Sequence, residues 1–147
     1  MKNEFVLRGQ TASGETELLE FGGYKEGYAY RLTEFTIYPS TNIAGNNIEL
    51  VASVTAAKIA VAPTDPNFND EGLIGTALFN LNSIASYPGF TNSVINDTFL
   101  ITQNLILMVQ DQDGGDPINW QCRFQAVKLT DSQQAVTNYK QFSIFDE

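Results

Sequence analysis

The sequence predicts an all-β protein: an antiparallel sandwich of two sheets, jelly-roll-like, with one short helix near the C-terminus. Apolar and polar residues alternate along most of the chain, and a period of two is that of strands. Turn-forming residues recur at fairly regular spacing between these segments, and strands do not alternate with helices as they do around a parallel sheet. The 147 residues exceed the roughly 100 of an immunoglobulin domain and include a single cysteine, which favours a jelly roll.

The whole chain, residues 1–147, is expected to fold as one domain. Its length suffices for one hydrophobic core, since hydrophobic residues make up 43% of it. We find no internal repeat, low-complexity tract or change of composition that would mark a linker between domains.

Strands are expected wherever alternation or a short apolar run is bounded by turn formers. The expected strands are Phe5 to Gly9, Leu18 to Phe21, Tyr28 to Tyr38, Ile48 to Val61, Leu73 to Leu81, Phe99 to Val109, Ile118 to Ala126 and Phe142 to Phe145. In the third strand the apolar phase switches from even to odd positions after Leu32, which predicts a bulge or a crossing between sheets. In the fourth strand, the alanine-rich residues 56–60 could form a helical turn, but the β-branched residues before them argue against it.

The clearest alternation lies at residues 118–126, where the even positions are apolar and the odd positions polar. The segment 99–109 has a nearly continuous apolar phase with Gln103 as its interruption. Between the two segments, residues 111–117 are dense in turn formers. These three features together predict a long antiparallel hairpin.

The short helix is expected to begin at Thr130. Thr130 as N-cap and Gln133 three residues later form a capping box, and the apolar residues that follow recur at helical spacing.

Composition excludes several classes of function. Without histidine the chain has no imidazole general base, no Ser-His or Cys-His pair and no His-ligated metal. Cys122 is the only cysteine, so an intrachain disulfide, a Cys₄ zinc site and a CxxC redox pair are excluded. No glycine-rich phosphate-binding motif occurs either. We therefore expect no enzymatic activity and no cofactor, and we assign no catalytic, cofactor-binding or metal-binding residue.

Charge and hydropathy bear on the partners. Eight Lys and Arg face 17 Asp and Glu, the formal net charge is −9, and the bases occur singly, which predicts no binding to nucleic acid or anionic lipid. The longest apolar run, residues 105–109, is far short of the roughly 20 needed to span a bilayer. Residues 1–8 lack the apolar segment of a secretory signal, so no such signal is expected.

Two acidic loops, residues 65–72 and 111–116, carry oxygen ligands at alternate positions, as calcium sites do. Neither loop fits the EF-hand pattern: the first lacks the glycine at its sixth position, and the second has Gly115 where a ligand belongs. The same residues dominate ordinary turns, so a structural role is favoured and calcium binding is the minority hypothesis.

Other candidates also have a structural interpretation that we favour. Four tyrosines and the tryptophan could form a platform for sugar rings: Tyr24, Tyr28, Tyr30, Tyr38 and Trp120. The interpretation that we favour places these side chains in the core and at the rim of the sandwich. The carboxylates of Glu15, Glu17 and Glu20 are expected on a solvated face rather than in a glycosidase pair. Cys122 is expected to be a small core residue. The sequon at residues 96–98 is expected to be a chance match.

Tyr30 to Tyr38 and Asn119 to Gln125 show the general texture of the chain: alternating strands whose polar faces carry few charges and many amides and hydroxyls. In this texture the chain resembles small β-sandwich structural proteins of virus particles, of the bacteriophage capsid or decoration type. The resemblance implies a subunit located in the virion, which assembles with itself and with other virion proteins and has no catalytic activity. The net charge of −9 favours an outward or vertex position, away from packaged genome.

A carbohydrate-binding, lectin-like sandwich is the alternative function. It would use the tyrosines between residues 24 and 38 and could depend on Ca²⁺ bound by the acidic loops.

Overall fold

A computed structural model describes residues 4–20, 27–40, 47–56, 63–81, 90–112 and 115–130. Eight strands form in this part of the chain: β1 (Glu4–Thr11), β2 (Thr16–Leu19), β3 (Tyr28–Pro39), β4 (Ile48–Thr55), β5 (Leu73–Leu81), β6 (Phe90–Ile95), β7 (Leu105–Asp111) and β8 (Ile118–Lys128). The predicted all-β class is confirmed. The helix predicted from Thr130 and the strand predicted at 142–145 fall outside the described residues.

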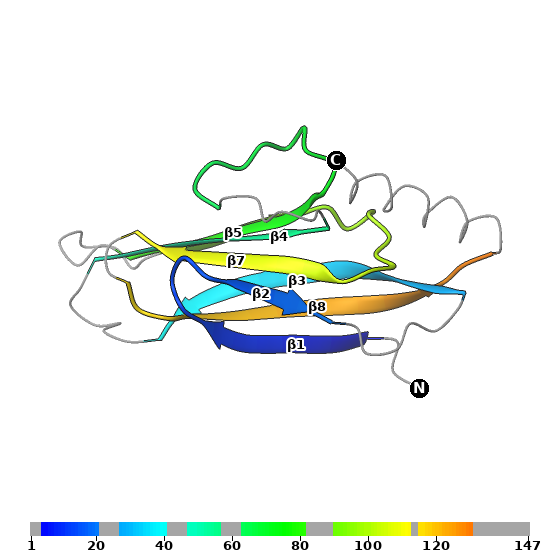
Figure 1. Cartoon of the computed structure of the whole chain (residues 1–147), viewed down its shortest axis with the longest axis horizontal. Helices are drawn as coiled ribbons and strands as arrows, with labels where there is room; N and C mark the ends of the chain where they lie inside the picture. Colours follow the sequence, from blue (N-terminus) through cyan, green and yellow to red (C-terminus); the bar gives the residue numbers. More distant parts are fainter. Residues whose placement is uncertain are drawn as a thin grey trace.

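The strands form two antiparallel sheets that face each other. The three-stranded sheet has the order β1-β8-β3, and the five-stranded sheet has the order β2-β7-β4-β5-β6. Figure 1 shows the two layers, with β4, β5 and β7 in one and β1, β3 and β8 in the other. The predicted two-sheet sandwich is therefore confirmed.

The pairing of strands follows a jelly roll. In that fold a long antiparallel ribbon is rolled up so that the first strand pairs with the eighth, the second with the seventh, the third with the sixth and the fourth with the fifth. Here β1 pairs with β8, β2 with β7 and β4 with β5. The exception is β6, which contacts β3 but pairs with β5, so that the three-stranded sheet lacks its fourth strand.

The predicted hairpin is wrong. β7 and β8 lie in different sheets, and the residues between them cross from one layer to the other. β7 also begins at Leu105 rather than Phe99, and Ile101 makes only an isolated bridge to Tyr30 of β3. Alternation identifies the buried face of a strand but not the strand beside it, because backbone hydrogen bonds are the same for every pairing.

Other strands also differ from expectation, and β2 spans Thr16–Leu19 where Leu18 to Phe21 was expected. β4 ends at Thr55 instead of Val61, and Ala56 already lies outside the strand. The strand β6 was not predicted, because its polar residues 91–93 interrupt any alternation. In the structure these three residues are exposed, whichever side of the sheet they face. A strand that buries neither face leaves no periodic signal in the sequence.

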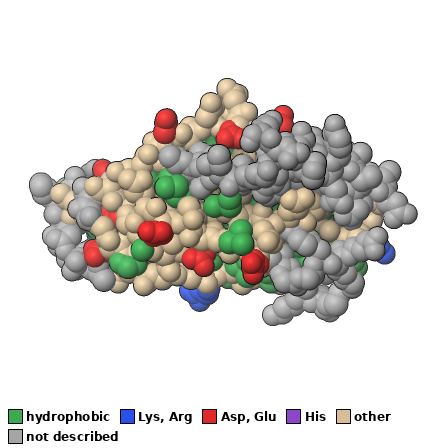
Figure 2. All heavy atoms as spheres, in the orientation of Figure 1, with side chains coloured by type: hydrophobic (Ala, Val, Ile, Leu, Met, Phe, Trp, Pro, Cys, Tyr) green, Lys and Arg blue, Asp and Glu red, His purple; other side chains and the backbone are tan. Residues whose placement is uncertain are grey.

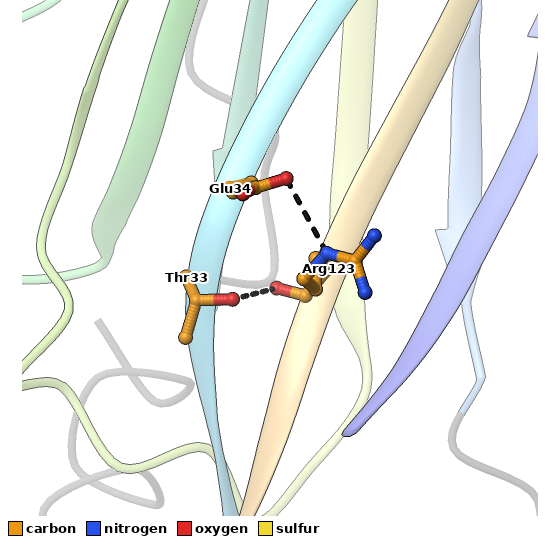
Figure 3. Close-up of polar contacts among 3 residues, drawn as sticks. All are labelled: Thr33, Glu34 and Arg123. Carbon is orange, nitrogen blue, oxygen red and sulfur yellow. Dashed lines mark hydrogen bonds and ion pairs between the residues drawn. The ribbon is translucent and has the colours of Figure 1, made fainter.

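The bulge predicted in β3 is confirmed. The register between β3 and β8 shifts between Leu32 and Glu34, so Thr33 is the extra residue. The Thr33 hydroxyl donates to the backbone oxygen of Arg123 (3.2 Å), and the Arg123 Nε donates to the Glu34 carboxylate (3.3 Å), as Figure 3 shows. Because of the bulge, Leu32 and Phe35 both face the core although their positions differ in parity.

The core lies between the inner faces of the two sheets. Its fully buried large side chains come from both layers: Leu32, Phe35, Ile118 and Phe124 from one sheet, and Val54, Ile74, Leu105, Leu107 and Val109 from the other. Gly75 of β5 allows a close approach of the layers, since a Cβ there would lie 3.1 Å from Leu32 and 3.4 Å from Phe35. At such packing density an added methyl group has no room.

A buried hydrogen bond joins the end of β1 to β8. The indole Nε1 of Trp120 donates to the Thr11 hydroxyl at 2.9 Å, and both residues are buried. We expect Thr11→Val to lower the free energy of unfolding by about 1–3 kcal/mol, because the indole N–H would remain buried without an acceptor. Urea denaturation measures this loss.

A double-mutant cycle provides the control for this hydrogen bond. In a Trp120→Phe background the donor is absent, so Thr11→Val is expected to cost much less than in the wild-type protein. An equal cost in both backgrounds would show that the hydrogen bond does not stabilise the fold.

Candidate functional site

Charge is distributed unevenly between the two sheets. Every described Lys and Arg lies on a strand of the three-stranded sheet, together with two glutamates: Arg8, Arg31, Arg123 and Lys128, with Glu4 and Glu34. The rest of the described chain carries only acids: Glu15, Glu17, Glu20, Glu49, Asp65, Asp70, Glu71, Asp97, Asp111 and Asp116. The strands of the three-stranded sheet therefore carry a formal +2 and the remaining described residues −10.

The three arginines lie on the outer face of the three-stranded sheet. Arg8 and Arg123 each lie between two neighbours that face inward, and Arg31 precedes the buried Leu32. In the view of Figure 2, carboxylate side chains are scattered among uncharged ones, and Lys and Arg side chains show only at the lower and right-hand margins. The structure thus has an arginine-bearing face and an acidic remainder.

Amides line one end of this arginine-bearing face. The Gln10 Nε2 donates to the Asn119 Oδ1 (3.0 Å), and the Asn119 Nδ2 donates to the Pro39 backbone oxygen (3.4 Å). Tyr38 lies in register with Asn119 and is 53% exposed. Its ring also contacts Phe79 of the five-stranded sheet, with centroids 5.6 Å apart. This end of the face is uncharged and rich in hydrogen-bonding groups.

The aromatic residues considered for sugar binding are not assembled into one platform. Trp120 is buried, as the alternation predicted. Tyr30 is half-buried and packs edge-on against Phe5, with centroids 5.4 Å apart. Tyr38 is eight positions further along β3 than Tyr30, roughly 26 Å away at about 3.3 Å per residue. Tyr24 falls outside the described residues. Only Tyr38 presents a substantially exposed ring among the described tyrosines and Trp120.

In the loop that follows β7, the carboxylate of Asp111 accepts hydrogen bonds from the backbone of the same loop. The Asp111 Oδ2 accepts hydrogen bonds from the N–H groups of Gly115 (3.2 Å) and Asp116 (3.3 Å). The Asp111 N–H donates to the Ser13 hydroxyl (2.8 Å), which ties this loop to the loop between β1 and β2. Asp113 falls outside the described residues. These contacts are those of a turn, the role favoured from the sequence.

The loop 65–72 shows the same use of its polar side chains. The Asn67 side-chain oxygen accepts the N–H of Asn69 (3.0 Å), and an Asp70 carboxylate oxygen accepts the N–H of Gly72 (3.1 Å). Both side chains thus stabilise local turns. Across the described ranges, no three His, Cys, Asp or Glu side chains are grouped so that they could hold a metal ion.

The three N-terminal glutamates and the sequon, which were also candidates for a function, lie in positions that a structural role explains. Glu15, Glu17 and Glu20 are exposed, as expected for a solvated face, and the Glu17 carboxylate accepts a hydrogen bond from the Thr11 hydroxyl (3.4 Å). Asn96 of the sequon accepts the N–H and hydroxyl of Thr98 in an exposed turn.

Cys122 is fully buried, as predicted for a core residue. Burial raises the pKa of the Cys122 thiol from 9.0 to about 12, because the low-polarity surroundings disfavour the thiolate. A neutral, buried thiol is a poor nucleophile.

Among the described residues, the edge of the five-stranded sheet at β6 has no further strand beside it, a feature that the sequence did not predict. Its last strand, β6, contains no charged residue, no proline and no glycine between Phe90 and Ile95. Residues 91–94 are all exposed, including Val94 at 49%. An uncharged run of six residues with β-forming side chains was the signal available in the sequence.

Comparison with known proteins gives no further assignment. No protein-family model matches the chain, and no curated protein matches it in sequence. In the described part of the chain, no helix is long and apolar enough to cross a membrane.

Proposed function

We propose that this protein is a structural subunit of a virus particle, which assembles with copies of itself and with other virion proteins and performs no catalysis. The observation that carries the proposal is the separation of charge between the two sheets. A subunit with +2 on one sheet and −10 on the rest of its described residues can place the arginine-bearing face of one copy against the acidic surface of the next.

A contact between two different surfaces of the same subunit can build the repeating assemblies of a virus particle. Because the two contacting surfaces differ, the contact is heterologous, and heterologous contacts close into rings or continue into open assemblies. The jelly-roll order of the strands supports the same role, since viral capsid domains use this fold. Lectins use it as well, so the fold supports the proposal only together with the distribution of charge.

The face itself is suited to repeated contact with protein. Its amides can form hydrogen bonds across an interface without the cost of burying charges, as the pair Gln10 and Asn119 illustrates within one copy. The net charge of −9 favours a position on the outside or at a vertex of the particle, away from nucleic acid.

We expect the protein to form a discrete oligomer larger than its 16.2 kDa monomer, as measured by size-exclusion chromatography with light scattering at low salt. Arg8→Glu should weaken this association about tenfold or more, because a negative charge replaces a positive one at the interface. Raising the salt concentration should weaken it as well.

Thr16→Glu is the control, because it introduces the same glutamate on the acidic part of the surface, where it should not weaken the association. A protein that stays monomeric at high concentration and low salt would contradict self-assembly. Saturable binding on a glycan array that Tyr38→Ala abolishes would favour the lectin function instead.

A further inference from the structure

We infer that β6 joins two copies of this chain edge to edge, so that two five-stranded sheets become one continuous ten-stranded sheet. This inference rests on the proposed self-assembly and names a second contact for it. It differs from the charge-based contact because the same strand serves both partners, which gives two-fold symmetry.

The four edge strands of the sandwich differ in how they are protected against pairing. Natural proteins protect edge strands with charges, prolines, bulges or short length. β1 carries Glu4 and Arg8, and β2 has four residues including Glu17. β3 contains the bulge, ends at Pro39 and is bridged at Tyr30 by Ile101. β6 has none of these features.

The backbone of β6 offers free hydrogen-bonding groups on its outer side. The Asn96 N–H donates to the Ile74 backbone oxygen (2.7 Å), just past the strand end, which sets the alternation along the strand. Residues of even number therefore bond towards β5, and Thr91, Ser93 and Ile95 point their N–H and C=O groups away from it. Within the described ranges, these three residues have no backbone partner on the outer side.

Residues 91–94 of β6 are exposed on both faces of the strand. Thr91 and Ser93 lie on the side of the sheet that faces the core, since their partners Phe79 and Ala77 pack against it. They are nevertheless exposed, although β3 of the three-stranded sheet contacts β6. An incoming strand thus meets an accessible edge.

The sequence of β6 is compatible with pairing to itself. In an antiparallel pair centred on Ser93, the two Ser93 residues lie opposite each other, Thr91 lies opposite Ile95, and Asn92 lies opposite Val94. Each outward-pointing N–H and C=O group then finds a partner in the other copy. No charged residue enters the pair, which matters between two copies that each carry −9.

Cysteine cross-linking in 1 M NaCl tests this contact separately from the charge-based one, because the screening length falls to about 3 Å at that ionic strength. In the proposed pair, the two Ser93 Cα atoms lie about 5.5 Å apart, within the range that a disulfide spans. We expect Ser93→Cys to form a covalent dimer of twice 16.2 kDa at least tenfold faster than Thr16→Cys under mild oxidation. Thr16 is the matched control, since it is an exposed residue on the opposite edge strand of the same sheet.

A second variant tests the edge without a cysteine. Ser93→Pro removes an N–H that points away from β5, so the fold should persist while association in 1 M NaCl is lost. Circular dichroism confirms the fold, and light scattering measures the association. Equal cross-linking rates at positions 93 and 16 would overturn the inference, and so would unchanged association of folded Ser93→Pro. In either case, association at low salt that Arg8→Glu weakens would leave the proposed function standing.

Discussion

Phe35→Ala is expected to lower the free energy of unfolding by about 3–5 kcal/mol, because it removes a fully buried ring from the centre of the sandwich. Phe35 follows the bulge of β3 and lies in register with Cys122 of β8. Its ring faces the other sheet, where Gly75 leaves it room. Alanine at position 35 leaves a cavity between two layers that each belong to a hydrogen-bonded sheet and cannot easily collapse. Urea denaturation followed by tryptophan fluorescence measures the loss.

Two comparisons separate the cavity from other effects of this substitution. Phe68→Ala removes the same ring from a residue that is 67% exposed and should change stability by no more than about 0.5 kcal/mol. Gly75→Ala alone should destabilise by about 1–3 kcal/mol through overpacking against Leu32 and Ile95, whose atoms would lie 3.1 and 3.3 Å from the added methyl group. It should cost less in the Phe35→Ala background, because the missing ring leaves space into which Leu32 can shift. Strict additivity of the two changes would contradict the packing described here.

The second large effect is expected at high pH. The pKa of Cys122 is raised to about 12 in the folded protein, whereas an exposed thiol of the unfolded chain ionises near 9.0. Between these values the unfolded chain binds fewer protons than the folded protein, so stability falls as pH rises. We expect no contribution below pH 9, a loss of about 1.4 kcal/mol per pH unit above it, and a total loss on the order of 4 kcal/mol by pH 12.

Cys122→Ala separates the contribution of the thiol from the other effects of high pH. The variant should be less stable than the wild-type protein at pH 7, because it leaves a small cavity. Its deficit should shrink above pH 9, since the variant lacks the group that ionises on unfolding. Parallel pH profiles of the two proteins would show that burial does not hold the thiol neutral.

Much of the surface could be predicted from sequence, but its functional arrangement could not. The even-numbered residues from Ile118 to Phe124 are buried as the alternation predicted, and Cys122 lies among them. Tyr28 and Tyr30 are half-buried, as expected for core and rim positions, whereas Tyr38 is exposed, and only the structure shows how far apart Tyr30 and Tyr38 lie along β3. The grouping of Arg8, Arg31 and Arg123 on one face was not visible, because these residues are scattered in the sequence and meet only when their strands pair.

The sequence by itself determined which face of most strands is dry, where β3 bulges and which kinds of chemistry the chain lacks. These properties are local: burial follows the period of side chains along one strand, and missing histidine is missing in any fold. Only the tertiary structure decided that β8 pairs with β1 and β3 rather than with β7, and that β6 is the last strand of the five-stranded sheet in the described part of the chain. The physical reason is that backbone hydrogen bonds carry no sequence information, so strand partners are chosen by the burial of the whole core.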